Sequence, residues 1–142
     1  MKNREAGSVD DVRVLFVEDD PALAQMYKLK LELDGYNVEV APDGEIALHM
    51  ARSQPPDIIF LDIRLPKLGG LDMLEALRAD PTTEAVPVVI LSSSSEKELV
   101  ERGARLGALD HLIKSKTTPG KLAGGVDGWL KHQPSRPPGT AG

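Results

Sequence analysis

The chain has 142 residues, which suit one domain with a real hydrophobic core and are few for two. It contains no cysteine, so disulfide frameworks and thiolate metal sites are excluded, and a cytoplasmic location is the simplest expectation. The net charge is −5 with no block of Lys and Arg, which argues against direct binding to nucleic acid. The longest apolar runs are only strand-sized, so we expect no insertion into a membrane.

Short apolar runs alternate five times with helix-periodic segments, a pattern typical of a parallel sheet wrapped by helices. We expect strands at about residues 12–17, 37–40, 57–61, 88–91 and 110–113. The first helix is expected to begin after Asp20, an N-cap residue followed by Pro21 at the first helical position. One stripe of this helix carries Ala22, Met26, Leu29 and Leu33.

The later helices carry similar signals. Ser95 and Glu98 fit a capping box that opens the fourth helix. The inward face of that helix is expected to use Leu99, Gly103 and Leu106. The fifth helix opens at Thr118-Pro119 and has apolar residues at helical spacing, namely Leu122, Val126, Trp129 and Leu130. Four glycines lie in or near it, and each interior glycine costs about 0.5–1 kcal/mol relative to alanine. We therefore expect this helix to be the least stable element, held mainly by Trp129.

Polar side chains stand where the apolar runs end. The first run ends at Glu18-Asp19-Asp20, the third at Asp62, the fourth at Ser92 and the fifth at Lys114. If these runs are neighbouring parallel strands, one rim of the sheet carries carboxylates, a hydroxyl and an ammonium group. Open α/β sheets place their binding sites at this carboxyl rim. The combination suits a divalent cation and a phosphoryl group.

These residues resemble the receiver domain of two-component response regulators, and in particular the single-domain, chemotaxis-regulator-like members. The matching segments are residues 15–21, 59–66, 88–92 and 112–114, together with Asp43-Gly44 and Gly69-Gly70. The resemblance covers residues 12–132. It implies a flavodoxin-like, doubly wound five-stranded parallel sheet in the order 2-1-3-4-5 with five flanking helices. We expect a receiver domain over residues 11–132, a flexible N-terminus over 1–10 and a disordered tail over 133–142.

The resemblance also implies a role for each rim residue. Asp62 would accept a phosphoryl group, and Asp19, Asp62 and the backbone carbonyl of Arg64 would bind Mg²⁺. Glu18 would reach the metal through water. Ser92 would bond the phosphoryl oxygens, and Lys114 would pair with them. Ser92 and His111 occupy the two positions that act as a switch in the family, although His111 stands where a Tyr or Phe is usual.

Several of these residues have a plain structural interpretation as well. Asp62 alone could be a strand-end aspartate that caps the next loop, and Asp20 is better explained as a helix cap than as a metal ligand. Lys116 is a rival to Lys114, and His111 could be a half-exposed structural histidine. Ser115 replaces the proline that usually follows the lysine with a cis bond, so the Lys114–Ser115 bond is either trans or strained.

The expected function is a phosphorylation-activated signalling switch of a two-component phosphorelay. Its phosphodonor would be a histidine kinase or a His-containing phosphotransfer protein, and its downstream partner would dock on the face of helix four, strand five and helix five. We expect catalysis only of its own phosphorylation and dephosphorylation, so it is not classed as an enzyme. The alternatives are a receiver fragment of a longer regulator and a binding module that is never phosphorylated.

Two other classes fit the sequence less well. A phosphatase of the dehalogenase type needs a second acid two residues after its nucleophile, where this chain has Arg64. A flavodoxin-like FMN carrier presents hydroxyls and amides to a phosphate in its first loop. Here the three acids from Glu18 to Asp20 would repel that phosphate.

Overall fold

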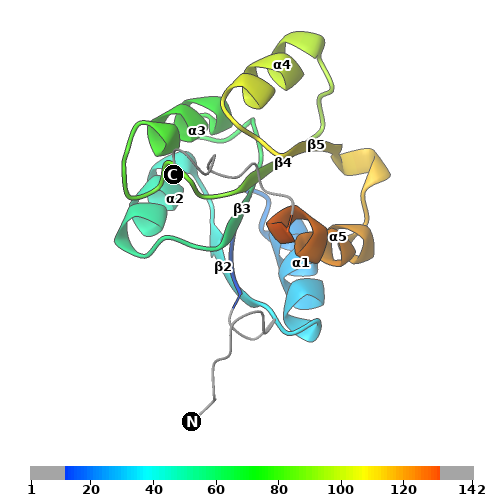
Figure 1. Cartoon of the computed structure of the whole chain (residues 1–142). Coiled ribbons are helices and arrows are strands. Elements are labelled where there is room, and N and C mark those ends of the chain that lie inside the picture. Colours follow the sequence, from blue (N-terminus) through cyan, green and yellow to red (C-terminus); the bar gives the residue numbers. More distant parts are fainter. Residues whose placement is uncertain (1–11, 132–142) are drawn as a thin grey trace.

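A computed structural model describes residues 12–131 of the chain (Figure 1). The flexible N-terminus expected over residues 1–10 and the disordered tail expected over 133–142 lie outside the described residues. Among the helices of the described part, none is both long and apolar enough to cross a bilayer.

Five parallel strands form one sheet in the order β2-β1-β3-β4-β5, as expected for a flavodoxin-like receiver fold. The strands are β1 (Arg13–Val17), β2 (Asn37–Ala41), β3 (Ile58–Leu61), β4 (Val88–Ser92) and β5 (Asp110–Ile113). The helices between and after them are α1 (Pro21–Leu33), α2 (Gly44–Ser53), α3 (Gly70–Arg78), α4 (Lys97–Arg105) and α5 (Pro119–Lys131). A short 3₁₀ turn, η2 (Lys114–Lys116), follows β5.

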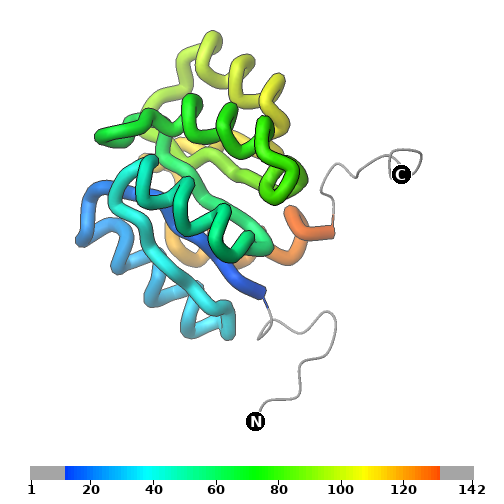
Figure 2. Tube along the Cα trace, turned by 90° about the vertical axis from the view of Figure 1, so that its left-hand side faces the viewer, coloured from blue at the N-terminus to red at the C-terminus, as the bar shows by residue number. Residues whose placement is uncertain are grey.

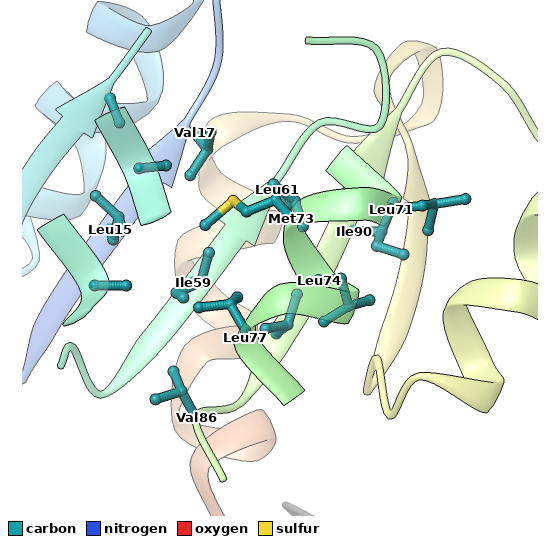
Figure 3. Packing of buried hydrophobic residues seen from close by; sticks show 14 of the residues in the cluster. Leu15, Val17, Ile59, Leu61, Leu71, Met73, Leu74, Leu77, Val86 and Ile90 are labelled. Carbon is teal, nitrogen blue, oxygen red and sulfur yellow. The ribbon is translucent and has the colours of Figure 1, made fainter. Parts of the chain in front are cut away.

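The sheet separates two hydrophobic clusters. On one face, β-strand side chains such as Ile59 and Ile90 pack against α2, α3 and α4 (Figure 3). On the other face, Phe16 and Phe60 pack against α1 and α5. Figure 2 shows α2 and α3 lying side by side over the first face. Because both faces are covered, the central strands β1, β3 and β4 are apolar over most of their length. The edge strands β2 and β5 also carry polar residues such as Glu39 and His111.

The first helix begins as the sequence predicts, but its buried face differs from the predicted stripe. The Asp20 carboxylate accepts hydrogen bonds from the N–H groups of Ala22 and Leu23 at 3.0 and 3.3 Å, so Asp20 is the N-cap. The stripe at Met26, Leu29 and Leu33 is exposed. The residues that α1 buries against the sheet are Ala24, Tyr27 and Leu31.

The capping box predicted for α4 is not formed. The helix begins at Lys97 with Glu96 at the N-cap position, and no side chain caps it. Instead, the Ser94 hydroxyl accepts a hydrogen bond from the Glu96 N–H at 3.2 Å, which turns the chain before the helix starts. Gly103 is buried, and Leu99 and Leu106 pack against the core, so the predicted inward face of α4 is confirmed.

Candidate functional site

Strand register brings the predicted rim residues together. Val17 pairs with Leu61, so the residues that follow them, Glu18 and Asp62, leave neighbouring strands at the same level. At the other side of β4, Ser92 pairs with Ile113, the residue directly before Lys114. The carboxyl ends of β1, β3, β4 and β5 therefore meet at one edge, as the sequence pattern predicts.

Lys114 joins the two buried carboxylates of this edge. Its Nζ donates a hydrogen bond to Asp62 Oδ2 at 2.8 Å. It also lies 2.8 Å from Glu18 Oε1 in an ion pair. Glu18 and Asp62 are only 2% and 5% exposed, so each carboxylate has lost most of its water. Lys116, the sequence rival of Lys114, is exposed and makes no described ion pair within the part of the chain that the structure covers.

Burial and charge pull the ionisation of these groups in opposite directions. Burial raises the pKa of Glu18 above its ordinary value, even though Lys114 and the Asp20 N–H both favour the ionised form. Burial acts to lower the pKa of Lys114, but the contacts with Asp62 and Glu18 outweigh it, and the pKa lies above its ordinary value. The Lys114 ammonium thus favours the ionised form of both carboxylates.

The same edge has the donor set of a hard divalent cation. Glu18, Asp19 and Asp62 can each place one carboxylate oxygen within 4.8 Å of the others. Glu18 Oε1 is buried and has no hydrogen-bond partner besides its ion pair with Lys114. Asp19 is exposed, which leaves the cluster open to solvent on one side. Carboxylate oxygens around an open position fit Mg²⁺, which keeps several of its waters when bound.

The loop after β3 shapes the surroundings of Asp62. The N–H of Arg64 donates to Asp62 Oδ1 at 3.1 Å. Since Lys114 donates to Oδ2, each oxygen of this carboxylate has a hydrogen-bond donor that fixes its orientation. The Gly70 N–H donates to the Ile63 carbonyl at 2.8 Å, which brings the start of α3 against the loop. A side chain at position 70 would meet the Asp62 carbonyl oxygen at 2.2 Å, so only glycine permits this approach. Gly70 thus allows the start of α3 to pack directly against the backbone of Asp62.

Ser92 and His111 are connected through Ser94. Ser92 is fully buried at the end of β4, and its hydroxyl oxygen accepts the Ser94 N–H at 3.1 Å. His111 Nε2 lies 2.8 Å from the Ser94 carbonyl oxygen. Because that oxygen only accepts hydrogen bonds, Nε2 carries the hydrogen. His111 Nδ1 is buried without a partner, and the residue lines an apolar cavity of about 290 Å³ together with Ile90 and Val100.

The connection after β5 differs from the usual pattern of the family that the sequence resembles. All peptide bonds of the described residues are trans, so the Lys114–Ser115 bond is trans. The chain then turns through η2, in which the Thr117 N–H donates to the Lys114 carbonyl at 3.2 Å. Lys114 still points at both carboxylates, so the missing proline has not moved its side chain away from them.

Two residues next to this edge were not singled out from the sequence. The Tyr27 hydroxyl donates to the Thr117 carbonyl at 3.0 Å, directly after the turn that carries Lys114. Tyr27 forms a set with Ala24 and Leu31, and the spacing of this set fits an α-helix as well as the spacing of the exposed stripe does. A tyrosine within such a set could have indicated this contact from the sequence, because a buried tyrosine hydroxyl needs a hydrogen-bond partner.

The fold and the edge define a class of protein, namely α/β domains that carry an acidic cluster and a lysine at the carboxyl rim of a doubly wound sheet. The chain belongs to the response regulator receiver domain family, whose family model matches residues 14–123. Receiver domains are parts of two-component systems and interact with histidine kinases or phosphotransfer proteins.

Curated relatives agree with this assignment. The chain is 35% identical over 125 residues to the DNA-binding response regulator MtrA of Mycolicibacterium smegmatis, covering 88% of this chain and 53% of that protein. It is 39% identical over 105 residues to the transcriptional regulatory protein MalR of Bacillus subtilis, covering 72% and 44%. The chain thus spans about half the length of the curated relatives that it matches.

Solved structures show the same fold. The receiver domain of the Francisella response regulator 1452 has a TM-score of 0.77 and 32% identity, with 85% of this chain and 98% of that chain covered. The Vibrio cholerae chemotaxis protein CheY4 has a TM-score of 0.73 and 31% identity, with 78% and 92% covered. The predicted resemblance and fold class are therefore confirmed.

Proposed function

We propose that the protein is a phosphorylation-activated switch that accepts a phosphoryl group on Asp62 from a histidine kinase or a His-containing phosphotransfer protein. The observation that carries the proposal is the position of Lys114 Nζ, which lies 2.8 Å from both Asp62 Oδ2 and Glu18 Oε1. A fixed ammonium beside a buried carboxylate is the arrangement that phosphoryl transfer requires, since positioning and charge neutralisation are its main needs.

In the proposed reaction, a carboxylate oxygen of Asp62 forms a bond to phosphorus while the bond from phosphorus to the donor's imidazole nitrogen breaks. The imidazole leaves with the electron pair of that bond, and an acyl phosphate remains on Asp62. Lys114 would neutralise the phosphoryl oxygens, and the Ser92 hydroxyl would turn from the Ser94 N–H to bond one of them. We propose no reaction beyond the protein's own phosphorylation and dephosphorylation.

Glu18, Asp19 and Asp62, with the backbone carbonyl of Arg64, are the groups that would hold Mg²⁺. The ion would supply positive charge to the attacking carboxylate and to the transferring phosphoryl oxygens. The three carboxylates come from the ends of two neighbouring strands, β1 and β3, which brings them together at one edge of the sheet.

Other proteins are the partners that we propose on both sides of the reaction. The downstream partner would dock on α4, β5 and α5, because His111 in β5 contacts Ser94, whose N–H is hydrogen-bonded to the switch serine Ser92. Relatives such as MtrA are named DNA-binding, but they are about twice as long as the matched region, and we propose no nucleic-acid contact for that region. A cytoplasmic location remains part of the proposal, consistent with a chain that has no cysteine.

Incubation with acetyl phosphate and Mg²⁺ tests the proposal. We expect intact-protein mass spectrometry to show one added phosphoryl group on the wild type and none on Asp62→Asn. Asp57→Asn is the matched control, because Asp57 is an exposed aspartate at the opposite end of the same strand. It should be phosphorylated like the wild type. A wild type without an adduct would contradict the proposal and favour a receiver-like binding module that works without phosphorylation.

A further inference from the structure

The segment that presents Lys114 has little packing of its own. Ser115 and Lys116 are exposed, and Ser115 does not restrict its backbone as a proline at that position would. Lys114 Nζ makes two contacts of 2.8 Å, and a restrained backbone reduces the entropy that this flexible side chain loses in making them. A neighbouring residue can supply this restraint.

Thr117 supplies that restraint through three hydrogen bonds. Its N–H donates to the Lys114 carbonyl at 3.2 Å, which closes the 3₁₀ turn. Its hydroxyl donates to the Ile113 carbonyl at 2.9 Å, which returns the chain to the end of β5. Its own carbonyl accepts the Tyr27 hydroxyl at 3.0 Å. The first bond lies within the turn and the second joins it to β5, which directly precedes it in the chain, whereas the third ties it to α1, which is distant in sequence.

Packing in the core fixes the position of Tyr27, which donates the hydrogen bond to the Thr117 carbonyl. It is 2% exposed, and its ring stacks on Phe16 at 5.2 Å between centroids and an angle of 22°. Phe16 lies next to Phe60, with centroids 5.9 Å apart, and the two are register partners in β1 and β3. Phe16 stands two residues before Glu18, and Phe60 stands two residues before Asp62. The Tyr27 ring therefore packs directly on β1, and through Phe16 it is connected to β3, so both strands that carry the carboxylates support it.

We propose that Tyr27 is a positioning residue for Lys114: through the Thr117 carbonyl, its hydroxyl fixes the turn that presents the ammonium to Asp62 and Glu18. This hydrogen bond restrains the backbone of the turn, as the usual proline would do at the position of Ser115. Burial raises the pKa of Tyr27, with smaller effects from the charges of Lys114 and Glu18, so the hydroxyl keeps its proton and remains a donor at neutral pH. The consequence for phosphorylation depends on the function proposed above.

Tyr27→Phe removes the hydroxyl and keeps the stacked ring. Tyr36→Phe is the matched control, since Tyr36 is also buried but lies directly before β2 and has no described contact with this turn. The first measurement is amide hydrogen exchange in the full chain without Mg²⁺ or phosphodonor. We expect exchange at Thr117 to rise by about two- to tenfold in Tyr27→Phe, the range that loss of one ordinary hydrogen bond produces, and to stay unchanged in Tyr36→Phe.

The second measurement is the rate of Asp62 phosphorylation over a range of acetyl phosphate concentrations at saturating Mg²⁺. We expect the maximal rate to fall by about two- to tenfold in Tyr27→Phe, with the half-saturating concentration nearly unchanged, because the carboxylates remain in place. A purely structural role would instead raise exchange across the whole sheet and leave this rate constant as it is.

The two measurements separate the possible outcomes. Faster exchange confined to the turn together with a lower maximal rate supports the proposal. Unchanged exchange at Thr117, or local loosening without any loss of rate, overturns it. If the wild type itself takes no phosphoryl group, the proposed function fails. In that case the exchange result alone decides whether Tyr27 fixes the turn.

Discussion

A single ammonium group, that of Lys114, stabilises two buried carboxylates. Two buried carboxylates with no cation between them would repel each other, and one of them would take up a proton. The ammonium contacts both at 2.8 Å and keeps the pair compatible with burial. Its position also explains why burial does not neutralise the lysine, whose pKa is raised overall. At the residue scale, the site is held together by one shared charge.

Lys67 carries a backbone strain that glycine would relieve. It has a φ of 71°, the only positive φ at a non-glycine residue among the described positions, and its side chain is exposed. The left-handed conformation costs an L-residue about 1–2 kcal/mol, whereas glycine adds about 0.5–1 kcal/mol of unfolded-state entropy. We expect Lys67→Gly to raise the free energy of unfolding by up to about 1 kcal/mol, as measured by urea denaturation.

The contrasting variant is Lys67→Val. A β-branched side chain fits a positive φ poorly, so this change should lower the free energy of unfolding by about 1 kcal/mol or more. If valine and glycine had equal effects at this position, the strain that we assign to Lys67 would not exist in solution.

At the scale of elements, α5 is the helix whose sequence fits its structure least. Gly124 and Gly128 have open space where a Cβ would lie, so neither is required for packing. Gly125 is different, because a Cβ there would come within 2.8 Å of the Trp129 ring. That ring packs edge-on against Phe60, and its N–H donates to Asp110 Oδ2 at 3.2 Å. Trp129, which packs over Gly125, thus fixes the helix, whereas Gly124 and Gly128 weaken it.

The glycines of α5 can be tested one by one. We expect Gly124→Ala and Gly128→Ala each to stabilise the protein by about 0.5–1 kcal/mol and to slow amide exchange within α5. Gly125→Ala should give no such gain, since the new methyl group displaces the Trp129 ring. Thermal denaturation and hydrogen exchange measure both effects. Equal stabilisation by all three variants would show that Trp129 does not pack as described.

The ends of the strands could be predicted from the sequence because each signal there is strong and local. An apolar run that stops at a carboxylate, a serine or a lysine marks a strand end, and parallel strands bring such ends together. Glu18, Asp62 and Lys114 meet for this reason. Asp20 could also be predicted, since its cap depends only on residues within the next three positions of the chain.

The buried face of α1 could not be predicted in the same way. Two stripes on this helix have helical spacing, and the stripe at Met26, Leu29 and Leu33 contains more aliphatic residues than the buried one. Only the packing of Tyr27 on Phe16 decides between them, and that contact depends on the assembled sheet. Ser95 failed as a cap for a related reason. The hydrogen bonds that bind Ser94 to Ser92 and His111 set the path of the chain before α4 begins.

At the scale of the whole molecule, the site concentrates negative charge at one edge of a protein that is already negatively charged. The chain has a net charge of −5, and three of its carboxylates lie within reach of one another at the rim. A ligand that binds only the folded state stabilises it, by about 2.7 kcal/mol at a hundred times its Kd. Mg²⁺ is therefore expected to raise the urea midpoint in a saturable way.

Asp19→Asn separates binding from screening. Asp19 is exposed, so its replacement should leave the fold intact while removing one carboxylate of the cluster. The stabilisation by Mg²⁺ should then shrink or require more ion, whereas NaCl at equal ionic strength should stabilise neither protein in a saturable way. If Asp19→Asn and the wild type responded to Mg²⁺ alike, the cluster would not be the site of binding.

The chain has one tryptophan, and its place in the fold gives the protein a built-in optical reporter. Trp129 rests on Phe60, two residues before Asp62 in β3, and its indole N–H is bonded to Asp110, the neighbour of His111. Indole emission is sensitive to nearby charge and hydrogen bonding. All tryptophan fluorescence of this protein thus originates where the phosphoacceptor strand meets the edge formed by β5 and α5, so an event at Asp62 could be followed there without any attached label.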